Sequence, residues 1–319
     1  MGIMRAIEFK AYGGPEVLQL QDASAPVPGD GEVLIDVHAV SVNPVDWKIR
    51  SGRMAGGAAL ASAMITGRDG AGVVTAAGPG TDPASVGRRV AFLAPRGRGT
   101  WADQVTMPDA NIALIPDGVS FPDAAAVPLA GTSAWIPLVD IAKAGPGMRV
   151  LIHAGAGGVG SLGIQIARAR GAHVIATCSE RNVDFVRSLG ANEVIAYDRT
   201  PFEDAARNVD VVFDTMGGDV HDRSYKVLRR GGLMVCLMAE PFTDRGAEHG
   251  VTVTQAQVLP RQDILDALLK MMADGSLRVP VEAILPFADF RRAQELSQGG
   301  RVRGKIVLRL RDPDGSIAA

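Results

Sequence analysis

Short apolar runs broken by glycine, proline and aspartate fill the chain from Met4 to about Ile115. Such runs of four to eight residues, rich in valine and with little helical periodicity, are typical of β-strands. The clearest examples are residues 32–42, 70–78, 88–94 and 102–107. We therefore predict a β-rich domain over the first third of the chain.

From about Phe121 the pattern changes to helices alternating with strands, which predicts a parallel sheet with right-handed crossovers. The expected helices cover residues 122–142 and 159–171, and the expected strands cover residues 149–154, 173–178, 193–197, 209–216 and 232–238. Near the C-terminus, an amphipathic helix over residues 263–275 precedes a strand over residues 304–310. We expect this last strand to pair with the N-terminal β-rich domain.

A glycine-rich turn joins the first strand of the alternating region to its helix and reads Gly155-Ala156-Gly157-Gly158-Val159-Gly160. In a GxGxxG turn, the first glycine allows the tight turn, the second lets the backbone approach a pyrophosphate, and the third lets helix and strand pack closely. The helix N-terminus adds N–H donors for the anion. Because the motif lies in a strand–turn–helix–strand unit of about 30 residues, it predicts a dinucleotide-binding site. The buried face of its helix is expected to consist of Val159, Leu162, Ile166 and Ala169.

The residues after the next strand indicate which dinucleotide binds. An NAD-selective site has an Asp or Glu about 20 residues past the glycine turn, but this strand ends at Cys178. Ser179, Arg181 and Asn182 follow, and their hydroxyl, guanidinium and amide groups suit a 2′-phosphate better than a ribose diol. We therefore predict NADPH. Glu180 conflicts with this, because its carboxylate would repel the phosphate, and we expect it to face solvent.

Composition narrows the possible classes of function. The 319 residues include 33 Lys and Arg and 35 Asp and Glu with no run of like charge, which argues against a nucleic-acid partner. No apolar stretch reaches the roughly 18 residues of a membrane span, and the N-terminus does not resemble a signal peptide. Two cysteines are too few for a disulfide framework. We expect a cytoplasmic protein with no membrane partner.

The histidines and cysteines of the sequence do not have the spacing that is typical of metal ligands. The five histidines are scattered, and His38 and His153, in predicted strands, are expected to be structural. Cys178 and Cys236 fall in the nucleotide-binding half, and two thiols cannot form a four-thiolate zinc site. We predict no metal.

Several motifs in order give the chain a resemblance that covers nearly its whole length. They are "GGPEVL" at Gly13, "NPVDWKIRSG" at Asn43, "GRDGAGVV" at Gly67, "PDAAAVPLAGTSAW" at Pro122, "HAGAGGVG" at His153 and "GKIVLRL" at Gly304. With them the chain resembles the zinc-independent medium-chain dehydrogenase/reductase superfamily, in its quinone oxidoreductase and alkenal (enone) reductase branch. Zinc-dependent members have a Cys near the position of Asp46 and Gly-His-Glu where this chain reads Gly67-Arg68-Asp69, so both metal positions are replaced.

The resemblance implies an α/β chain of two domains. Residues 1–123 and 276–319 would form a GroES-like β-rich barrel domain, and residues 124–275 a Rossmann doubly wound parallel sheet, with NADPH meeting a flat electrophile in the cleft between them. By the same resemblance, Asn43 approaches the nicotinamide and Thr132 lies beside it. Ser179, Arg181 and Tyr197 would surround the adenosine 2′-phosphate.

The resemblance also has departures. Some quinone reductases of this branch have tyrosines at the positions of Lys48 and Met54, and this chain has neither. Hydride transfer to a quinone or to the β-carbon of an enone needs donors aimed at the oxygen that becomes negative. Lys48 is the first candidate donor and Asn43 the second. A solvated surface position is the alternative for Lys48. Asp46 would orient Lys48 or hold the loop, and water would supply the proton. Trp47 would either line the substrate pocket or fill the barrel, and we expect the second.

Three functions follow from these expectations. The first is an NADPH-dependent reductase of quinones or activated alkenes. The second is a pathway-specific enoyl reductase in biosynthesis, in which the small residues 54–64 leave room for a bulky substrate. The third is a crystallin-like protein that binds NADPH with little turnover. The apolar strand over residues 232–238, expected near a sheet edge, predicts a homodimer.

Overall fold

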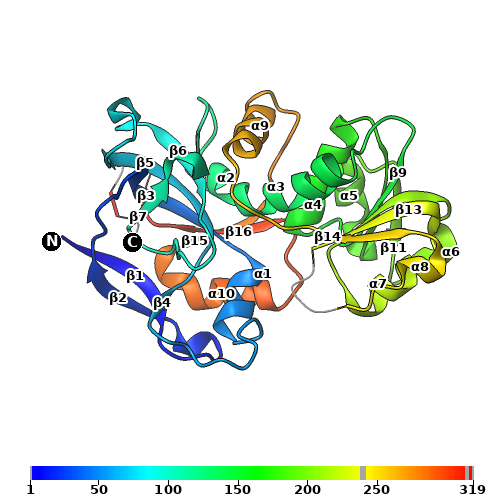
Figure 1. The fold of residues 1–319 in the computed structure, drawn as a ribbon, viewed down its shortest axis with the longest axis horizontal. Helices are drawn as coiled ribbons and strands as arrows, with labels where there is room; N and C mark the ends of the chain where they lie inside the picture. The colour runs from blue at the N-terminus through cyan, green and yellow to red at the C-terminus, as the bar shows by residue number, and fades with distance from the viewer. Residues whose placement is uncertain (1, 238–241, 313–315, 318–319) are drawn as a thin grey trace. The chain divides into compact units, whose positions relative to one another are not determined.

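The computed structural model describes residues 2–237, 242–312 and 316–317. The chain forms two compact units, drawn in Figure 1. The β-rich unit comprises Met1–Leu129, Leu259–Gly275 and Val279–Ala319, and the parallel-sheet unit comprises Ala130–Val258 and Ser276–Arg278. These limits differ from the expected domain boundaries after residues 123 and 275. Helices α2 and α9 account for the difference, because both pack on strands of the β-rich unit.

The β-rich unit contains two sheets. Its elements are β1 (Ile3–Phe9), β2 (Gln19–Ser24), β3 (Glu32–Val42), α1 (Pro44–Arg50), β4 (Met64–Ile65), β5 (Asp69–Ala77), β6 (Arg89–Leu93), β7 (Gln104–Pro108), β8 (Ile112–Leu114), α2 (Phe121–Ala126), α9 (Gln262–Ala273), β15 (Val281–Pro286), α10 (Phe290–Gln298) and β16 (Lys305–Arg309). One sheet has the order β2-β1-β4, and the other has the order β15-β16-β3-β5-β6-β8, with β7 also paired to β3. The indole of Trp101 is fully buried in the core of this unit.

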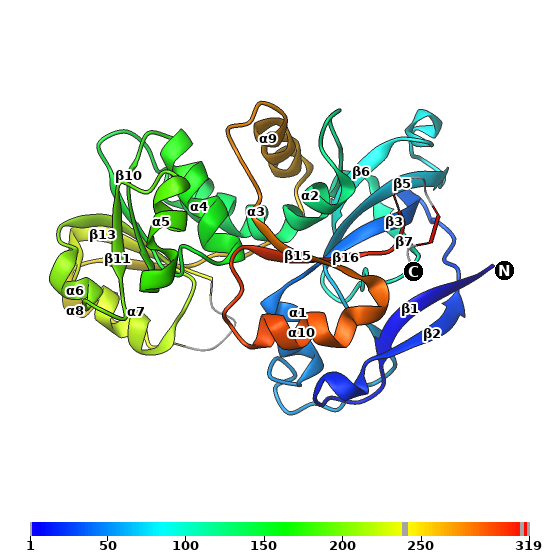
Figure 2. The ribbon, with the colours of Figure 1, turned by 180° about the vertical axis from the view of Figure 1, so that it is seen from behind.

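The C-terminal strand returns to the N-terminal sheet, as the sequence predicts. β16 pairs antiparallel with β3, with Ile306 opposite Val42. The preceding helix α10 lies beside α1, which Figure 2 shows from behind. The last strand therefore brings residues near position 305 against the end of β3, where α1 begins.

The parallel-sheet unit contains one six-stranded sheet. Its elements are α3 (Pro128–Trp135, which begins in the β-rich unit), a π-helix (Ile136–Ile141), β9 (Arg149–Ile152), α4 (Gly158–Ala169), β10 (His173–Cys178), α5 (Val183–Ser188), β11 (Glu193–Ala196), α6 (Phe202–Ala205), β12 (Val209–Asp214), α7 (Gly218–Ser224), β13 (Leu228–Cys236), α8 (Gly246–His249) and β14 (Thr252–Gln255). The strand order β11-β10-β9-β12-β13-β14 is entirely parallel and corresponds to the 3-2-1-4-5-6 order of a Rossmann sheet. The α/β fold class is therefore confirmed.

Three sequence expectations need correction in this unit. The single helix expected over residues 122–142 is broken at Pro128, because proline lacks an N–H and disfavours a helical residue before it. The expected edge strand β13 is covered by β14, and Met238 lies outside the described residues. On α4, Ala169 is exposed, whereas Ile164 and Ala167 are buried, because the helix packs against the π-helix as well as the sheet.

The turn between β9 and α4 brings backbone atoms of the parallel-sheet unit into close approach at Gly160. A Cβ atom on Gly160 would lie 2.3 Å from the carbonyl oxygen of Ala154, which is a backbone atom that cannot swing away. Ala154 itself has a φ of 52°, a left-handed conformation that costs an alanine roughly 1 kcal/mol. Gly160 therefore sets how closely α4 approaches the strand.

Among the described residues, no helix combines the length and the apolar character that crossing a bilayer requires.

We expect Gly160→Ala to lower the free energy of unfolding by about 2 kcal/mol, because the added methyl group forces α4 away from β9. Gly157→Ala is the matched control, since its added Cβ would lie 3.4 Å from the nearest atom. Urea unfolding of the parent and both variants measures the difference. Equal stability of the two variants would contradict this account of the turn.

Candidate functional site

The N-terminus of α4 presents free backbone donors. Gly157 precedes the helix in an extended conformation, and the first intrahelical hydrogen bond runs from the Ser161 N–H to the Gly157 carbonyl at 2.9 Å. The N–H groups of Gly158, Val159 and Gly160 come before that bond, so they have no partner within the helix. This arrangement is suited to binding the pyrophosphate of a dinucleotide.

The first half of the turn is anchored to the neighbouring strand. The Gly155 N–H donates to the carbonyl of Thr177 in β10 at 2.8 Å, and Ala156 is buried. The turn is therefore fixed against the strand whose end carries the expected 2′-phosphate residues.

Four of the expected cofactor residues gather at the carboxyl ends of β10 and β11. Asn182 is buried and donates from Nδ2 to the Ser179 hydroxyl at 3.1 Å. Arg181 is exposed in the same short turn. The Tyr197 N–H donates to the Cys178 carbonyl at 3.0 Å, and the residue is 58% exposed. The end of β11 therefore lies beside the turn that follows β10.

Glu180 is exposed in this corner and forms an ion pair with Arg199. Its backbone N–H donates to Asp198 Oδ1 at 2.8 Å. Arg199 was not a sequence candidate, since it comes from the turn after β11, 19 residues from Glu180. The carboxylate that conflicted with a 2′-phosphate thus already has a cationic partner.

Thr132 lies in α3 and is fully buried. Its hydroxyl has no hydrogen-bond partner within the described residues. A buried hydroxyl without a partner is unusual, and it leaves a polar group able to bond a nicotinamide amide. The contact itself stays a prediction.

Asn43, at the start of α1, is locked into a buried network. Its Nδ2 group donates to the Ser41 hydroxyl at 3.1 Å and to Asp69 Oδ1 at 2.9 Å. Its Oδ1 atom accepts from Lys305 Nζ at 2.5 Å, and its backbone N–H donates to Asp46 Oδ2 at 2.7 Å. Both amide hydrogens are therefore used within the protein.

Asp69 is the centre of this network and is fully buried. Besides Asn43, its Oδ1 atom accepts from the Ser41 hydroxyl at 2.7 Å, and its Oδ2 atom accepts from the Leu129 N–H at 2.9 Å. Lys305 is also buried, which lowers its pKa, and the charge of Asp69 opposes that shift. Asp69 and Lys305 both lie in motifs of the sequence, but the sequence gives no signal that both bond Asn43 in one buried network.

Asp46 is 1% exposed, and its Oδ1 atom has no partner in the described part of the chain. Burial raises the pKa of Asp46 to about 7, and the nearby charge of Asp69 adds to the shift, while the Asn43 N–H, Lys305 and Arg68 oppose it. The carboxyl group therefore changes protonation near neutral pH. Its hydrogen bond to the Asn43 N–H holds the start of α1, and no described contact joins it to Lys48.

Arg68 is 8% exposed and donates from Nη2 to the Ala94 carbonyl at 3.1 Å. Burial lowers its pKa, and the charges of Asp46 and Asp69 oppose that shift. The guanidinium thus balances the two carboxylates electrostatically.

Lys48 and Trp47 lie on α1 and are only half-buried. The Lys48 ammonium is 5.9 Å from the centre of the Trp47 ring, and the Arg53 guanidinium is 5.2 Å from it. Trp47 therefore does not fill the barrel as expected; the fully buried tryptophan is Trp101. The sequence of so short a helix as α1 gives no signal of how deeply each of its side chains is buried.

The two strand histidines have structural contacts. His153 lies between the hydroxyls of Thr177 and Ser224, at 3.1 and 2.9 Å, and burial lowers its pKa to about 4. His38 stacks on Phe121 with ring centres 4.1 Å apart, and burial lowers its pKa to about 4 as well.

One group of potential metal ligands occurs among the described residues, which the scattered spacing in the sequence did not indicate. Asp214, His221 and Cys236 are buried with their ligand atoms within 4.8 Å of one another. His221 Nδ1 lies 2.9 Å from Asp214 Oδ2, and His221 Nε2 lies 3.0 Å from the Tyr225 hydroxyl. Burial raises the pKa of the Cys236 thiol to about 12, so the group is built as a hydrogen-bonded cluster around a neutral thiol.

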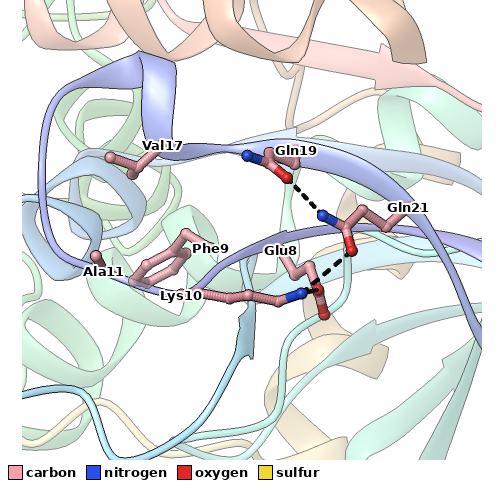
Figure 3. Close-up of a pocket in the computed structure, with 7 residues that line it drawn as sticks. All are labelled: Glu8, Phe9, Lys10, Ala11, Val17, Gln19 and Gln21. Atoms are coloured by element: carbon pink, nitrogen blue, oxygen red, sulfur yellow. Dashed lines mark hydrogen bonds and ion pairs between the residues drawn. The ribbon is translucent and has the colours of Figure 1, made fainter.

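A small pocket of the β-rich unit contains none of the candidate residues. Figure 3 shows it between β1 and β2, where Lys10 reaches Glu8 and Gln21, at 3.4 Å in each case. Phe9 and Val17 form its apolar side. Because neither the glycine turn nor the Asn43 network contributes to it, it carries no part of the candidate site.

Profiles of two known domains match the chain. The alcohol dehydrogenase GroES-like domain matches residues 29–117, and the zinc-binding dehydrogenase domain matches residues 189–308. The chain is 30% identical to the chloroplastic quinone-oxidoreductase QR1 of Triphysaria versicolor, over 96% of this chain and 98% of that protein. It is 36% identical to polyketide synthase GfsB of Streptomyces halstedii over 92% of this chain, but it spans only 5% of that protein.

Solved structures of quinone oxidoreductases also match this chain over nearly its whole length. The quinone oxidoreductase from Coxiella burnetii superposes with a TM-score of 0.89 at 32% identity, covering 97% of this chain and 100% of that one. The Escherichia coli quinone oxidoreductase complexed with NADPH superposes with a TM-score of 0.85 at 28% identity, covering 96% and 99%.

We expect Asp46→Asn to change how stability depends on pH. Since the pKa of Asp46 rises from 3.8 to about 7 on folding, the folded state holds a proton that the unfolded state has released between these values. Raising the pH from 5 to 8 therefore costs the parent on the order of 2 kcal/mol through this group. The variant keeps an oxygen for the Asn43 N–H and loses this cost.

Urea unfolding at pH 5 and pH 8 measures the effect as the difference between variant and parent, in which the contributions of His38 and His153 cancel. Asp30→Asn, at an exposed loop residue, controls for the replacement itself. A difference that does not grow with pH would refute the assignment of the titrating group.

Proposed function

The chain belongs to the quinone oxidoreductase family of the medium-chain dehydrogenase/reductase superfamily, and we propose that it is an NADPH-dependent, zinc-independent reductase of quinones or of the activated C=C of α,β-unsaturated carbonyls. The observation that carries the proposal is the glycine turn at α4 with Ser179, Arg181 and Asn182 beside it. Together they offer an anion site for a pyrophosphate and polar and cationic groups for a 2′-phosphate. The quinone oxidoreductases among its relatives support the acceptor class.

A bound nicotinamide supplies the hydride, and the residues of the chain position the reactants and stabilise charge. Thr132 is proposed to bond the nicotinamide through its buried hydroxyl. Lys48 is proposed as the donor to the substrate oxygen, since both amide hydrogens of Asn43 are engaged. Asn43 and Asp46 then act by holding the start of α1, and water protonates the product.

A pathway-specific enoyl reductase is the second candidate function. The 36% identity to a segment of polyketide synthase GfsB favours it, as do the small residues of the largely exposed segment 54–64. A crystallin-like protein that binds NADPH with little turnover is the third, because Lys48 and Met54 stand where some quinone reductases of the branch have tyrosines. Preferred reduction of an enoyl-thioester would favour the pathway-specific enoyl reductase, and the absence of turnover with every acceptor would favour the binding protein.

We further propose a cytoplasmic homodimer. The outer edge of β14 has no strand beside it in the described chain, and two copies that pair there would form one continuous sheet. We expect twice the chain mass in light scattering at micromolar concentration. A monomer mass at that concentration would contradict the dimer.

We expect the protein to oxidise NADPH, read by absorbance, with members of a panel of quinones, short alkenals, cyclic enones and one enoyl-thioester. NADH should be at least about tenfold less efficient, because the 2′-phosphate contacts are then lost. Preference within the panel selects between the first two functions. Tight NADPH binding without turnover would favour the binding protein, and equal use of NADH would contradict the assignment of Ser179 and Arg181.

A further inference from the structure

The turn after β11 places a second arginine in the corner that holds Ser179 and Arg181. The Tyr197 N–H bonds the Cys178 carbonyl at 3.0 Å, and Asp198 Oδ1 accepts the Glu180 N–H at 2.8 Å. These two contacts fix the turn against the end of β10. Arg199, the next residue, extends from this turn to the carboxylate of Glu180.

The ion pair formed there is open to solvent. The side chains of Arg199 and Glu180 are 66% and 54% exposed, so the pair adds little to stability. A guanidinium can bond either a carboxylate or a phosphate through two hydrogen bonds, but a phosphate carries up to twice the negative charge and three acceptor oxygens, so it is the stronger partner. An arriving phosphate can therefore displace Glu180 from Arg199.

We propose that Arg199 is a second guanidinium of the adenosine 2′-phosphate subsite, and that Glu180 occupies it as an internal competitor until the cofactor binds. The proposal rests on NADPH as the cofactor. In the free protein the Glu180 carboxylate pairs with Arg199, and in the complex the phosphate takes its place while Glu180 faces solvent. Affinity for a 2′-phosphate is thus set by an exchange of partners rather than by an open cationic pocket.

Two roles for Arg199 must be separated by experiment. If Arg199 contacts the phosphate, its loss removes an attraction. If it only keeps Glu180 away, its loss frees a carboxylate that repels the phosphate. Both roles weaken binding in Arg199→Gln, and the double variant with Glu180→Gln distinguishes them.

The test is calorimetric binding of adenosine 2′,5′-bisphosphate and of AMP, which differs from it only in lacking the 2′-phosphate, to the full chain. We expect Arg199→Gln to bind the bisphosphate about tenfold more weakly and Glu180→Gln to bind it several-fold more tightly, with AMP unchanged in both. The double variant should remain weaker than Glu180→Gln alone. Arg187→Gln, which removes the comparable exposed pair with Asp184 on α5, is the matched control and should leave both ligands unaffected.

The outcomes are distinct. A parent that does not prefer the bisphosphate to AMP overturns the proposed cofactor. A parent that prefers it, with Arg199→Gln unchanged, overturns only the role of Arg199. A double variant equal to Glu180→Gln limits Arg199 to holding Glu180 and overturns the phosphate contact, and an unchanged Glu180→Gln overturns the competition.

Discussion

The buried carboxylate of Asp69 is the constraint on which the part of the candidate site around Asn43 depends. Its two oxygens accept from the Ser41 hydroxyl, the Asn43 amide and the Leu129 N–H, so one side chain of β5 holds the end of β3, the start of α1 and the start of α3. A carboxylate buried this deeply is tolerated only when hydrogen bonds and opposite charges replace water. Moving any one of these partners away would leave the buried carboxylate without a hydrogen bond. Because that loss is costly, each partner is held in place and the arrangement is rigid.

The charges around Asp69 explain why Asn43 and Asp46 differ in behaviour. The Asn43 amide is fixed at both ends, by Lys305 on its oxygen and by Ser41 and Asp69 on its nitrogen. Asp46 has one oxygen held by the Asn43 N–H and one without a partner in the described chain. Protonation near neutral pH is therefore a property of Asp46, while the side-chain amide of Asn43 is held by partners other than Asp46. The cluster separates a fixed group from a titrating one within a single turn of helix.

Much of the fold could be predicted from the sequence, because its strongest signals are local. The strand–turn–helix around Gly157, the parallel sheet and the return of the last strand all follow from periodicity and glycine placement. The Pro128 break, the position of β13 inside the sheet and the half-buried Trp47 did not, because each depends on neighbours that a linear pattern does not contain. The network of Asn43 was missed for the same reason: its contact with Lys305 joins residues 262 positions apart.

The two halves of the candidate site differ in how far apart in the sequence their contacting residues lie and in how deeply they are buried. The cofactor corner is built from contacts between residues 3 to 19 positions apart, and its charged groups are exposed. The Asn43 network joins segments up to 263 positions apart and is buried. A substitution in the corner is therefore expected to have little effect on folding, whereas a substitution in the network disturbs several elements at once. The exposed groups of the corner are therefore free to change, whereas the geometry of the Asn43 network is tied to the stability of the β-rich unit.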